Sequence, residues 1–441
     1  MDSNFNYKPL LRLTCSVQTY DWGRPGRDSL VARLYGLNSG GEVELDRSYA
    51  EFWMGTHESG PSFVVNSGLE NGNGPESGSF KSWVLKNPNV LGDKVLVNWG
   101  CDLPFLFKVL SVAKALSIQA HPDKELAKTL HKLLPNVYKD DNHKPEMALA
   151  ITEFEALCSF ISLQVPETCA LIWLGGWELK SVMQNVPEIV ELVGSAAASQ
   201  VLHINKQDGE EKVKSILRSV FTQLMTATKE MTAKAISNLK IRLHEESEVR
   251  LLTEKEQLVL RLEKQYPGDI GVISAFFFNY VKLKPGEALY LGANEPHAYI
   301  SGECVECMAT SDNVVRAGLT PKHRDVQTLC SMLTYKQGFP EILKGFPLSP
   351  YITRYLPPFD EFEVDCCILP QGASAVFPEV SGPSIFLVTV GEGTMHTASQ
   401  IDAVTEGDVL FAPANTEISI TTSSDLQLYR AGVNSRFLQT V

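Results

Sequence analysis

Apolar residues follow two different spacings along this chain. Short β-branched or aromatic runs, separated by Gly and Pro, occur within residues 1–156 and return after residue 267, where they predict strands. Residues 157–266 instead carry apolar positions three and four apart, which is the spacing of amphipathic helices. The clearest predicted strands lie at 276–283, 288–291, 384–390 and 426–430. The chain is therefore predicted to be mainly β with a helical insertion.

Two apolar stripes define the predicted helices of the insertion. One consists of Ile216, Leu217, Val220 and Leu224, and the other, with one break in the helix, of Leu251, Leu252, Leu258, Val259 and Leu262. Pro267 and Gly268 end this region. In the first β region, leucines at four-residue spacing predict a helix over residues 123–134, and the Gly/Asn-rich residues 66–75 predict a flexible loop.

An internal repeat relates the two β regions. Residues 286–297 align with residues 407–418, so that a Gly-acidic pair, an apolar strand and an Ala-Asn corner fall in register. This is the pattern expected of a duplicated jelly-roll hairpin. The copies differ at their ends, where His297 is matched by Ile418. We therefore expect two jelly-roll barrels, one with a polar mouth and one filled by hydrocarbon.

Composition limits the class of protein and its ligands. The length of 441 residues suggests about three domains, and contents of 44% hydrophobic and 21% charged residues are those of folded, soluble chains. Lys and Arg number 39 against 52 Asp and Glu, which gives a net charge of −13. We expect no general attraction to nucleic acid or anionic membranes. An anionic ligand would need a local cluster of basic residues.

The sequence also gives an expectation for compartment and assembly. Residues 1–7 lack the basic and apolar regions of a secretory signal, and no apolar run approaches the ~20 residues of a membrane helix. The spacing of the 9 cysteines is not that of a small disulfide-rich domain, so free thiols in a reducing compartment are expected. We expect a cytoplasmic monomer without nucleic-acid or membrane partners.

Polar residues that suit metal binding lie at the ends of predicted strands. On a strand over residues 116–121, Ser117, Gln119 and His121 project to one face because side chains alternate. Glu146 opens an apolar run, and His297 precedes another. Two histidines, a carboxylate and an amide oxygen suit zinc, iron or manganese. The spacing alone leaves open that each is an ordinary polar residue at a strand end.

Several multi-residue blocks resemble the signature motifs of the type I mannose-6-phosphate isomerase family, in the family's order. They are YDWG at 20–23, AEFWMGTH at 50–57, QAHPDK at 119–124, HKPEM at 143–147, EPHAY at 295–299 and GECVECMATSDNVVRAGLTPK at 302–322. Phe52 departs conservatively from the aliphatic residue that is more usual there.

The resemblance implies a fold, a cofactor and a reaction. The fold is that of the cupin superfamily, with a discontinuous catalytic barrel (1–156 and 267–340), a helical insertion (157–266) and a C-terminal barrel without metal ligands (341–441). The reaction interconverts mannose 6-phosphate and fructose 6-phosphate through an enediol and feeds GDP-mannose metabolism. One Zn²⁺ per chain is implied, with the ligands Gln119, His121, Glu146 and His297.

The resemblance also suggests roles for charged residues. Arg316 would stabilise an oxyanion or hold the substrate, Glu306 and Asp312 would carry protons or orient the sugar, and Lys144 would be an acid/base or an anion anchor. An ion pair between Arg316 and Asp312 is the structural alternative. The phosphosugar is expected to contact Trp22, Lys108, Ser111, Ser117, Tyr299 and Lys322.

Lys108 and two further histidines have alternative explanations. Lys108 lies in an apolar strand, where a buried ammonium group is costly without a partner; the alternative is that its ammonium group lies in water. His57 and His143 fall inside the motif blocks and are expected to support the site rather than bind metal.

Two other functional classes compete with the isomerase. A non-catalytic bicupin that binds or stores sugars would show degenerate metal positions in both barrels, whereas only the second copy lacks its histidine. An iron oxygenase with two histidines and a carboxylate is the other alternative. Gln119 and the lysines near the motifs disfavour it.

Overall fold

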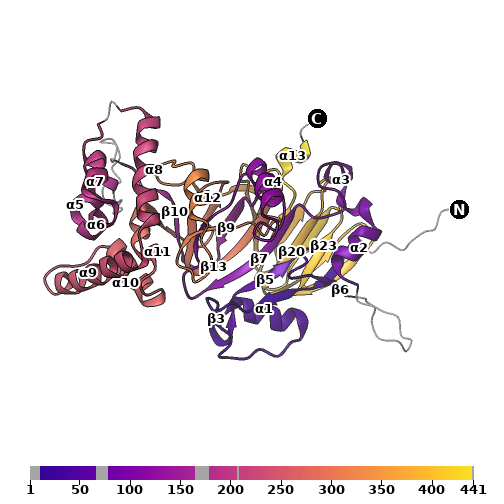
Figure 1. Cartoon of the computed structure of the whole chain (residues 1–441). Helices are drawn as coiled ribbons and strands as arrows, with labels where there is room; N and C mark the ends of the chain where they lie inside the picture. The colour runs from indigo at the N-terminus through magenta and orange to yellow at the C-terminus, as the bar shows by residue number, and fades with distance from the viewer. Residues whose placement is uncertain (1–9, 66–77, 164–177, 206–207, 440–441) are drawn as a thin grey trace.

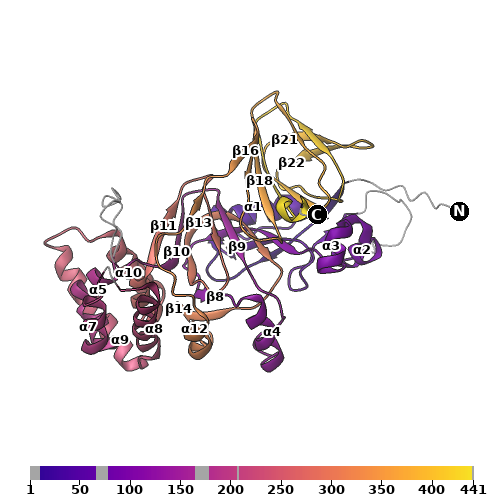
Figure 2. The same cartoon turned by 90° about the horizontal axis from the view of Figure 1, so that it is seen from above.

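The computed structural model describes residues 10–65, 78–163, 178–205 and 208–439. A block of helices lies at one side, a large sheet built around strand β13 (His297–Ala309) lies in the middle, and the C-terminal strands lie at the other side (Figures 1 and 2). The flexible loop predicted at 66–75 therefore lies outside the described residues.

The middle sheet holds its strands in the order β15-β12-β9-β13-β7-β5-β2. Strand β13 pairs with β7 and β9, and its N-terminal half pairs with β10 and β8. Continuous burial of β7 explains why its sequence is an almost unbroken apolar run. The bounds are β2 (Ser16–Gln18), β5 (Glu51–Met54), β7 (Phe105–Val112), β8 (Ile118–Ala120), β9 (Glu146–Ala150), β10 (Phe154–Phe160), β11 (Phe278–Leu283), β12 (Ala288–Leu291), β14 (Val315–Gly318) and β15 (Ile342–Leu343).

The C-terminal sheet repeats this order of strands. Its order β23-β20-β25-β18-β17-β16 corresponds one for one to β12-β9-β13-β7-β5-β2, and β1 and β6 extend it beyond β23. The bounds are β1 (Leu11–Thr14), β6 (Phe63–Val64), β16 (Phe346–Ser349), β17 (Ile352–Tyr355), β18 (Glu363–Leu369), β20 (Ser384–Val390), β23 (Val409–Ala412) and β25 (Leu426–Gly432). A smaller sheet consists of β19 (Ser374–Phe377), β21 (Glu392–His396), β22 (Ile401–Thr405) and β24 (Ile418–Thr421).

The backbone reproduces the repeat found in the sequence. Gly286 and Gly407 have φ angles of 83° and 89°, and Asn294 and Asn415 have φ angles of 62° and 61°. Left-handed backbone at a non-glycine residue is uncommon, and asparagine is one of the residue types that tolerates it. Two such residues at equivalent positions show that both copies turn the same corner.

Strand register identifies which residues are equivalent in the two sheets. Leu291 lies opposite Glu146 and its counterpart Ala412 lies opposite Ser384, so Ser384 takes the place of Glu146. The same comparison across the next two ladders places Arg430 at the position of Glu306 and Asp365 at that of Lys108.

The prediction that the second barrel is filled only by hydrocarbon is wrong. Ile418 is buried in an apolar cluster, but a charged group lies at the end of that cluster. Its members are Arg354, Glu363, Asp365 and Arg430. These two arginines and two carboxylates pair with one another, which makes a buried cluster of zero net charge.

The helical block packs its apolar stripes into one core that is continuous with the first sheet. Leu217, Val220 and Leu224 lie on the buried face of α8, as predicted. The bounds are α5 (Leu179–Asn185), α6 (Pro187–Val193), α7 (Ser195–Leu202), α8 (Glu210–Thr226), α9 (Lys229–Ser247), α10 (Glu254–Gln265) and α11 (Ile270–Ser274).

Two sequence-based expectations about this block differ from the structure. The predicted boundary at residue 157 falls inside β10, which continues to Phe160 and pairs with β11 and β13. Leu251 is 95% exposed and precedes α10, because a capping box at Thr253 and Glu256 starts the helix beyond it.

Shorter helices surround the sheets, and the one predicted at 123–134 is confirmed. It is α4, in which the Asp123 carboxylate caps the helix by accepting a hydrogen bond from the Leu126 amide. The bounds are α1 (Leu30–Ser39), α2 (Phe80–Lys86), α3 (Asp93–Trp99), α4 (Lys124–Leu133), α12 (Val326–Met332) and α13 (Ser435–Gln439).

A buried lysine joins the helical block to the sheet. Lys255 in α10 is 4% exposed, and its ammonium group donates to the carbonyls of Ala275 and Phe278. Among the described residues it forms no ion pair with a carboxylate. Burial lowers the pKa of Lys255 from 10.5 to about 7. Folding therefore favours its neutral form, and the unfolded chain binds more protons between these two pH values.

This linkage predicts how stability depends on pH. Stability should rise from about pH 7 toward pH 10 through Lys255, and Lys255→Met should flatten that rise. Urea unfolding at ~pH 7 and ~pH 9.5 measures the slope. Lys229→Met, at an exposed position of the same block, is the matched control. An unchanged slope in Lys255→Met would show that this residue is not the titrating group.

Candidate active site

Three strands that are distant in sequence bring the predicted metal ligands together. His121 follows β8 directly, Glu146 begins β9, and His297 begins β13. Register places Gln119 of β8 opposite His297 on one side and opposite Arg316 of β14 on the other. Strands β8 and β9, which lead to or contain predicted ligands, therefore pair with the two edges of β13.

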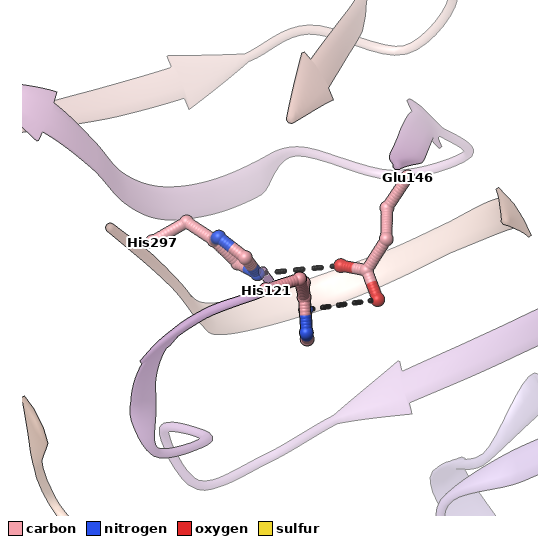
Figure 3. Close-up of side chains that lie close together, drawn as sticks. All are labelled: His121, Glu146 and His297. Atoms are coloured by element: carbon pink, nitrogen blue, oxygen red, sulfur yellow. Dashed lines mark ion pairs between the residues drawn. The ribbon is translucent and has the colours of Figure 1, made fainter. Parts of the chain in front are cut away.

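The side chains of His121, Glu146 and His297 converge on one point (Figure 3). Nε2 of His121 is 3.4 Å from Glu146 Oε1, and Nε2 of His297 is 3.3 Å from Glu146 Oε2. One ligand atom from each residue lies within 4.8 Å of the other two. All three residues are at most 2% exposed. They form a compact, buried group with nitrogen and oxygen donors.

The hydrogen bonds of these residues fit a metal ion. His121 Nδ1 is 2.6 Å from the Asn313 carbonyl, and His297 Nδ1 is 3.1 Å from the Glu295 carbonyl. A carbonyl only accepts, so Nδ1 carries the proton and Nε2 keeps its lone pair. His121 Nε2, His297 Nε2 and Glu146 Oε2 are buried without a hydrogen-bond partner. Orphaned acceptors that point at one another are costly unless a cation lies between them.

Electrostatics favour the metal-binding protonation states of His121 and Glu146. Burial lowers the pKa of His121 to about 4, although the Glu146 carboxylate opposes this shift. Burial alone would raise the pKa of Glu146, but Lys144 and the histidines bring it well below its usual value. Lys144 Nζ lies 3.1 Å from Glu146 Oε1. Neutral imidazole and ionised carboxylate are the ligand forms required for a divalent cation.

A second group of buried charges lies on the neighbouring strands. Lys108 is 5% exposed, and its ammonium group is 2.9 Å from Glu306 and 3.3 Å from Glu51. The alternative in which this ammonium lies in water is therefore wrong. Two carboxylates and the ring of Trp53, 4.9 Å away, compensate the buried charge. Burial alone would lower the pKa of Lys108, but the neighbouring carboxylates raise it. The Tyr299 hydroxyl is buried without a hydrogen bond, and burial and the nearby carboxylates raise its pKa.

Arg316 and Asp312 do not form the ion pair considered as an alternative. Asp312 instead lies 3.3 Å from Nε2 of His57, which lowers the pKa of that carboxyl. Within the described part of the chain, the partly buried Arg316 guanidinium has no side-chain partner. Burial lowers its pKa. Its strand partner Gln119 accepts a hydrogen bond from the Ser117 hydroxyl at 3.2 Å. An unpaired guanidinium is thus available beside the ligand strand.

The structure does not bring all predicted substrate contacts to this group. Ser111 projects from the opposite face of β7, where its hydroxyl donates to Glu303 at 2.7 Å and accepts from the Val31 amide. Lys322 is exposed. Trp22 packs against the apolar cluster that contains Tyr299.

His57 and His143 do not belong to the ligand group, as expected. His57 pairs with Asp312, and His143 Nε2 lies 2.6 Å from a carboxylate oxygen of Glu361 in the C-terminal part of the chain. Neither histidine lies within the group of His121, Glu146 and His297.

Sequence reasoning missed Glu51 and Asp140. Glu51 lies in a motif block, and its alternation with Trp53 on a strand was an available signal. Asp140 precedes another block and has no periodic signal of its own. Its carboxylate accepts hydrogen bonds from the Ser311 hydroxyl, the Asp312 amide and the Asn313 side chain. Through Asn313, whose carbonyl binds His121, Asp140 supports the orientation of a predicted metal ligand.

Comparisons with known proteins agree with this site. The models for the catalytic domain and the helical insertion domain of type I phosphomannose isomerase match residues 10–163 and 192–278. Mannose-6-phosphate isomerase 1 of Arabidopsis thaliana is 65% identical, over 97% of this chain and 95% of that protein. The mannose-6-phosphate isomerase of Bos taurus is 40% identical, over 95% of this chain and 97% of that protein.

Solved structures of such enzymes share the fold. An alanine variant of phosphomannose isomerase from Salmonella typhimurium has a TM-score of 0.77 at 27% identity, covering 97% of this chain and 100% of that one. A zinc-bound mannose 6-phosphate isomerase has a TM-score of 0.76 with the same coverage. The chain belongs to the type I phosphomannose isomerase family. It is an enzyme, an aldose–ketose isomerase, and the alternative of a non-catalytic bicupin is set aside.

Within the described residues, every helix is too short or too polar to cross a bilayer.

The Asp140 network makes a prediction about metal affinity. Asp140→Asn should weaken zinc binding by roughly 10- to 100-fold, because the carbonyl that fixes the His121 tautomer loses its support. Competition with a chromophoric chelator measures this affinity directly. Asp208→Asn, which removes a carboxylate from a turn in the helical block, should leave it unchanged. Equal affinities of Asp140→Asn and the unaltered protein would contradict the role assigned to Asp140.

Proposed function

We propose that the chain interconverts D-mannose 6-phosphate and D-fructose 6-phosphate through an enediol, with one zinc ion per chain. The proposal rests on the buried group of His121, Glu146 and His297. In this group the two Nε2 atoms and Glu146 Oε2 have no hydrogen-bond partner. Gln119 would be the fourth ligand, since it lies opposite His297 in the strand ladder and offers an amide oxygen.

The reaction sets clear chemical requirements. A proton must leave C2 of the open-chain aldose and a proton must be delivered to C1, while negative charge develops on the neighbouring oxygens. A bound zinc ion would supply Lewis-acid stabilisation of that charge. The protein must supply a group that moves the proton and cations that hold the phosphosugar in place.

Glu306 is suited to proton transfer. Burial raises its pKa, although Lys108 opposes this, and a carboxyl titrating closer to neutral pH moves protons more efficiently. Lys144 would act as the alternative acid/base or as an anion anchor, since its ammonium group lies beside Glu146. Asp312, kept ionised by His57, is suited to orienting the sugar hydroxyls.

Arg316 would hold or stabilise the anionic part of the substrate. Its guanidinium has no side-chain partner among the described residues and is partly buried on the strand next to the ligands. A guanidinium can bind an oxyanion through two parallel hydrogen bonds. Lys108, Ser117, Trp22, Tyr299 and Lys322 remain predicted substrate contacts. Ser111 is a weaker candidate because of its position on the far face.

The remaining expectations concern the whole chain. We propose a discontinuous zinc-binding domain of residues 1–156 and 267–340, extended at its first boundary to the end of β10 at Phe160, a helical insertion and a C-terminal domain from residue 341, as two jelly-roll barrels and a helical part. The equal strand orders of the two sheets support this division. The enzyme would act as a cytoplasmic monomer and supply mannose phosphate to GDP-mannose synthesis.

Removal of the metal tests the cofactor. Chelated enzyme should lose isomerisation of mannose 6-phosphate and regain it with added zinc. His297→Ala should lose bound zinc and activity together, because the site loses one of its ligands. Zinc content by mass spectrometry and formation of fructose 6-phosphate are the two readouts. His244→Ala, at an exposed helical position, is the control. Full activity after complete chelation would exclude a zinc mechanism.

Arg316 provides a separate test of substrate stabilisation. Arg316→Ala should keep its zinc and lose activity by about 100-fold or more, as expected when a charge-stabilising donor is removed. Arg316→Lys should recover only part of this loss, because an ammonium group cannot make the bidentate contact. Wild-type kcat/KM in the zinc-loaded alanine variant would remove Arg316 from the mechanism.

A further inference from the structure

The C-terminal part of the chain reaches the catalytic part through a hydrogen bond between Glu361 and His143. Glu361 lies in the connection between β17 and β18 and is 4% exposed. One of its carboxylate oxygens is 2.6 Å from Nε2 of His143, which is 218 positions away in the sequence. A buried carboxylate oxygen needs a hydrogen-bond partner of this kind, because it is removed from water. The contact therefore fixes both segments with respect to each other.

The connection that carries Glu361 is itself held firmly. The Asn434 side-chain amide donates to the carbonyls of Pro357, Phe359 and Phe362. The ring of Phe359 lies edge-on to Tyr290 at 5.9 Å, and Tyr290 belongs to β12, which pairs with β9. Glu361 is thus presented from a fixed support rather than from a free loop.

The segment that receives Glu361 has no regular secondary structure and depends on individual contacts for its position. Residues 139–145 lie outside helices and strands, between α4 and β9. On one side, Asp140 and Asn142 bind residues 310–313. On the other side, His143 binds Glu361. Lys144 lies between His143 and Pro145, whose carbonyl accepts a hydrogen bond from the Ala309 amide. The Lys144 ammonium group reaches Glu146. A side chain on an irregular segment is positioned only as well as the contacts that hold that segment.

We infer that Glu361 is a positioning residue for the isomerase reaction: through His143 it holds Lys144 against the ligand Glu146. The inference rests on the function proposed above for Lys144. It gives the C-terminal part of the chain a role in catalysis although the described residues place no metal group there.

A double-mutant cycle tests whether Glu361 acts through Lys144. In folded, zinc-loaded enzyme, Glu361→Ala should lower kcat roughly 10-fold and leave KM within about twofold. In a Lys144→Met background the same substitution should cost nothing further, because the group it positions is gone. Equal fractional losses in both backgrounds, or an unchanged kcat in the single variant, would overturn the inference. A Lys144→Met enzyme with full kcat would instead refute the proposed role of Lys144.

Hydrogen exchange supplies a readout that does not depend on activity. Amides of residues 140–146 should exchange faster in Glu361→Ala than in the unaltered enzyme, and unchanged protection would refute the inference. Glu361→Gln keeps an acceptor oxygen and should retain kcat within about threefold. If Glu361→Ala does not fold, Glu361→Asp, which is one methylene too short, takes its place. Glu406→Gln, which breaks the 2.7 Å ion pair with Arg33 in α1, is the matched control and should change neither readout.

Discussion

The neutralisation of three buried carboxylates governs the architecture of this site. Glu51, Glu146 and Glu306 are each less than 10% exposed, and carboxylates removed from water are tolerated only with compensating charge. Lys108 and Lys144 supply two positive charges at 2.9–3.3 Å. Three negative and two positive charges leave the group at −1, so a divalent cation is attracted and, once bound, makes the group positive. A cationic site can then hold an anionic phosphosugar in a chain whose overall charge is −13.

The second sheet has the same strand order as the first, but its buried residues at the equivalent positions carry different charges. At the positions of Glu146, Lys108 and Glu306 it carries Ser384, Asp365 and Arg430. Two arginines and two carboxylates cancel there, so no net charge remains to attract a cation. The planar fork of arginine satisfies carboxylates directly. The two sheets thus share one strand order, but among the described residues only the first carries a group that could hold a metal ion.

Local patterns predicted much of the fold. The strands at 288–291 and 384–390 coincide with β12 and β20, and the helix predicted at 123–134 is α4. Prediction was wrong where two local signals competed: Leu251 fits the apolar stripe, but the cap at Thr253 starts the helix after it. The helical block was predicted to start at 157, yet β10 continues to Phe160 because its partners β11 and β13 extend the ladder. Those partners are more than a hundred residues away.

The sequence by itself determined the family, the β-rich class with its helical insertion, and the residue types that suit a metal, because motifs and periodicity are local properties. Only the tertiary structure decided which of these residues are buried and paired. It placed Lys108 between two carboxylates, turned Ser111 to the far face of its strand, and joined Glu361 to His143. Burial and charge pairing arise between segments far apart in the chain, and the strand ladder that brings them together exists only after folding.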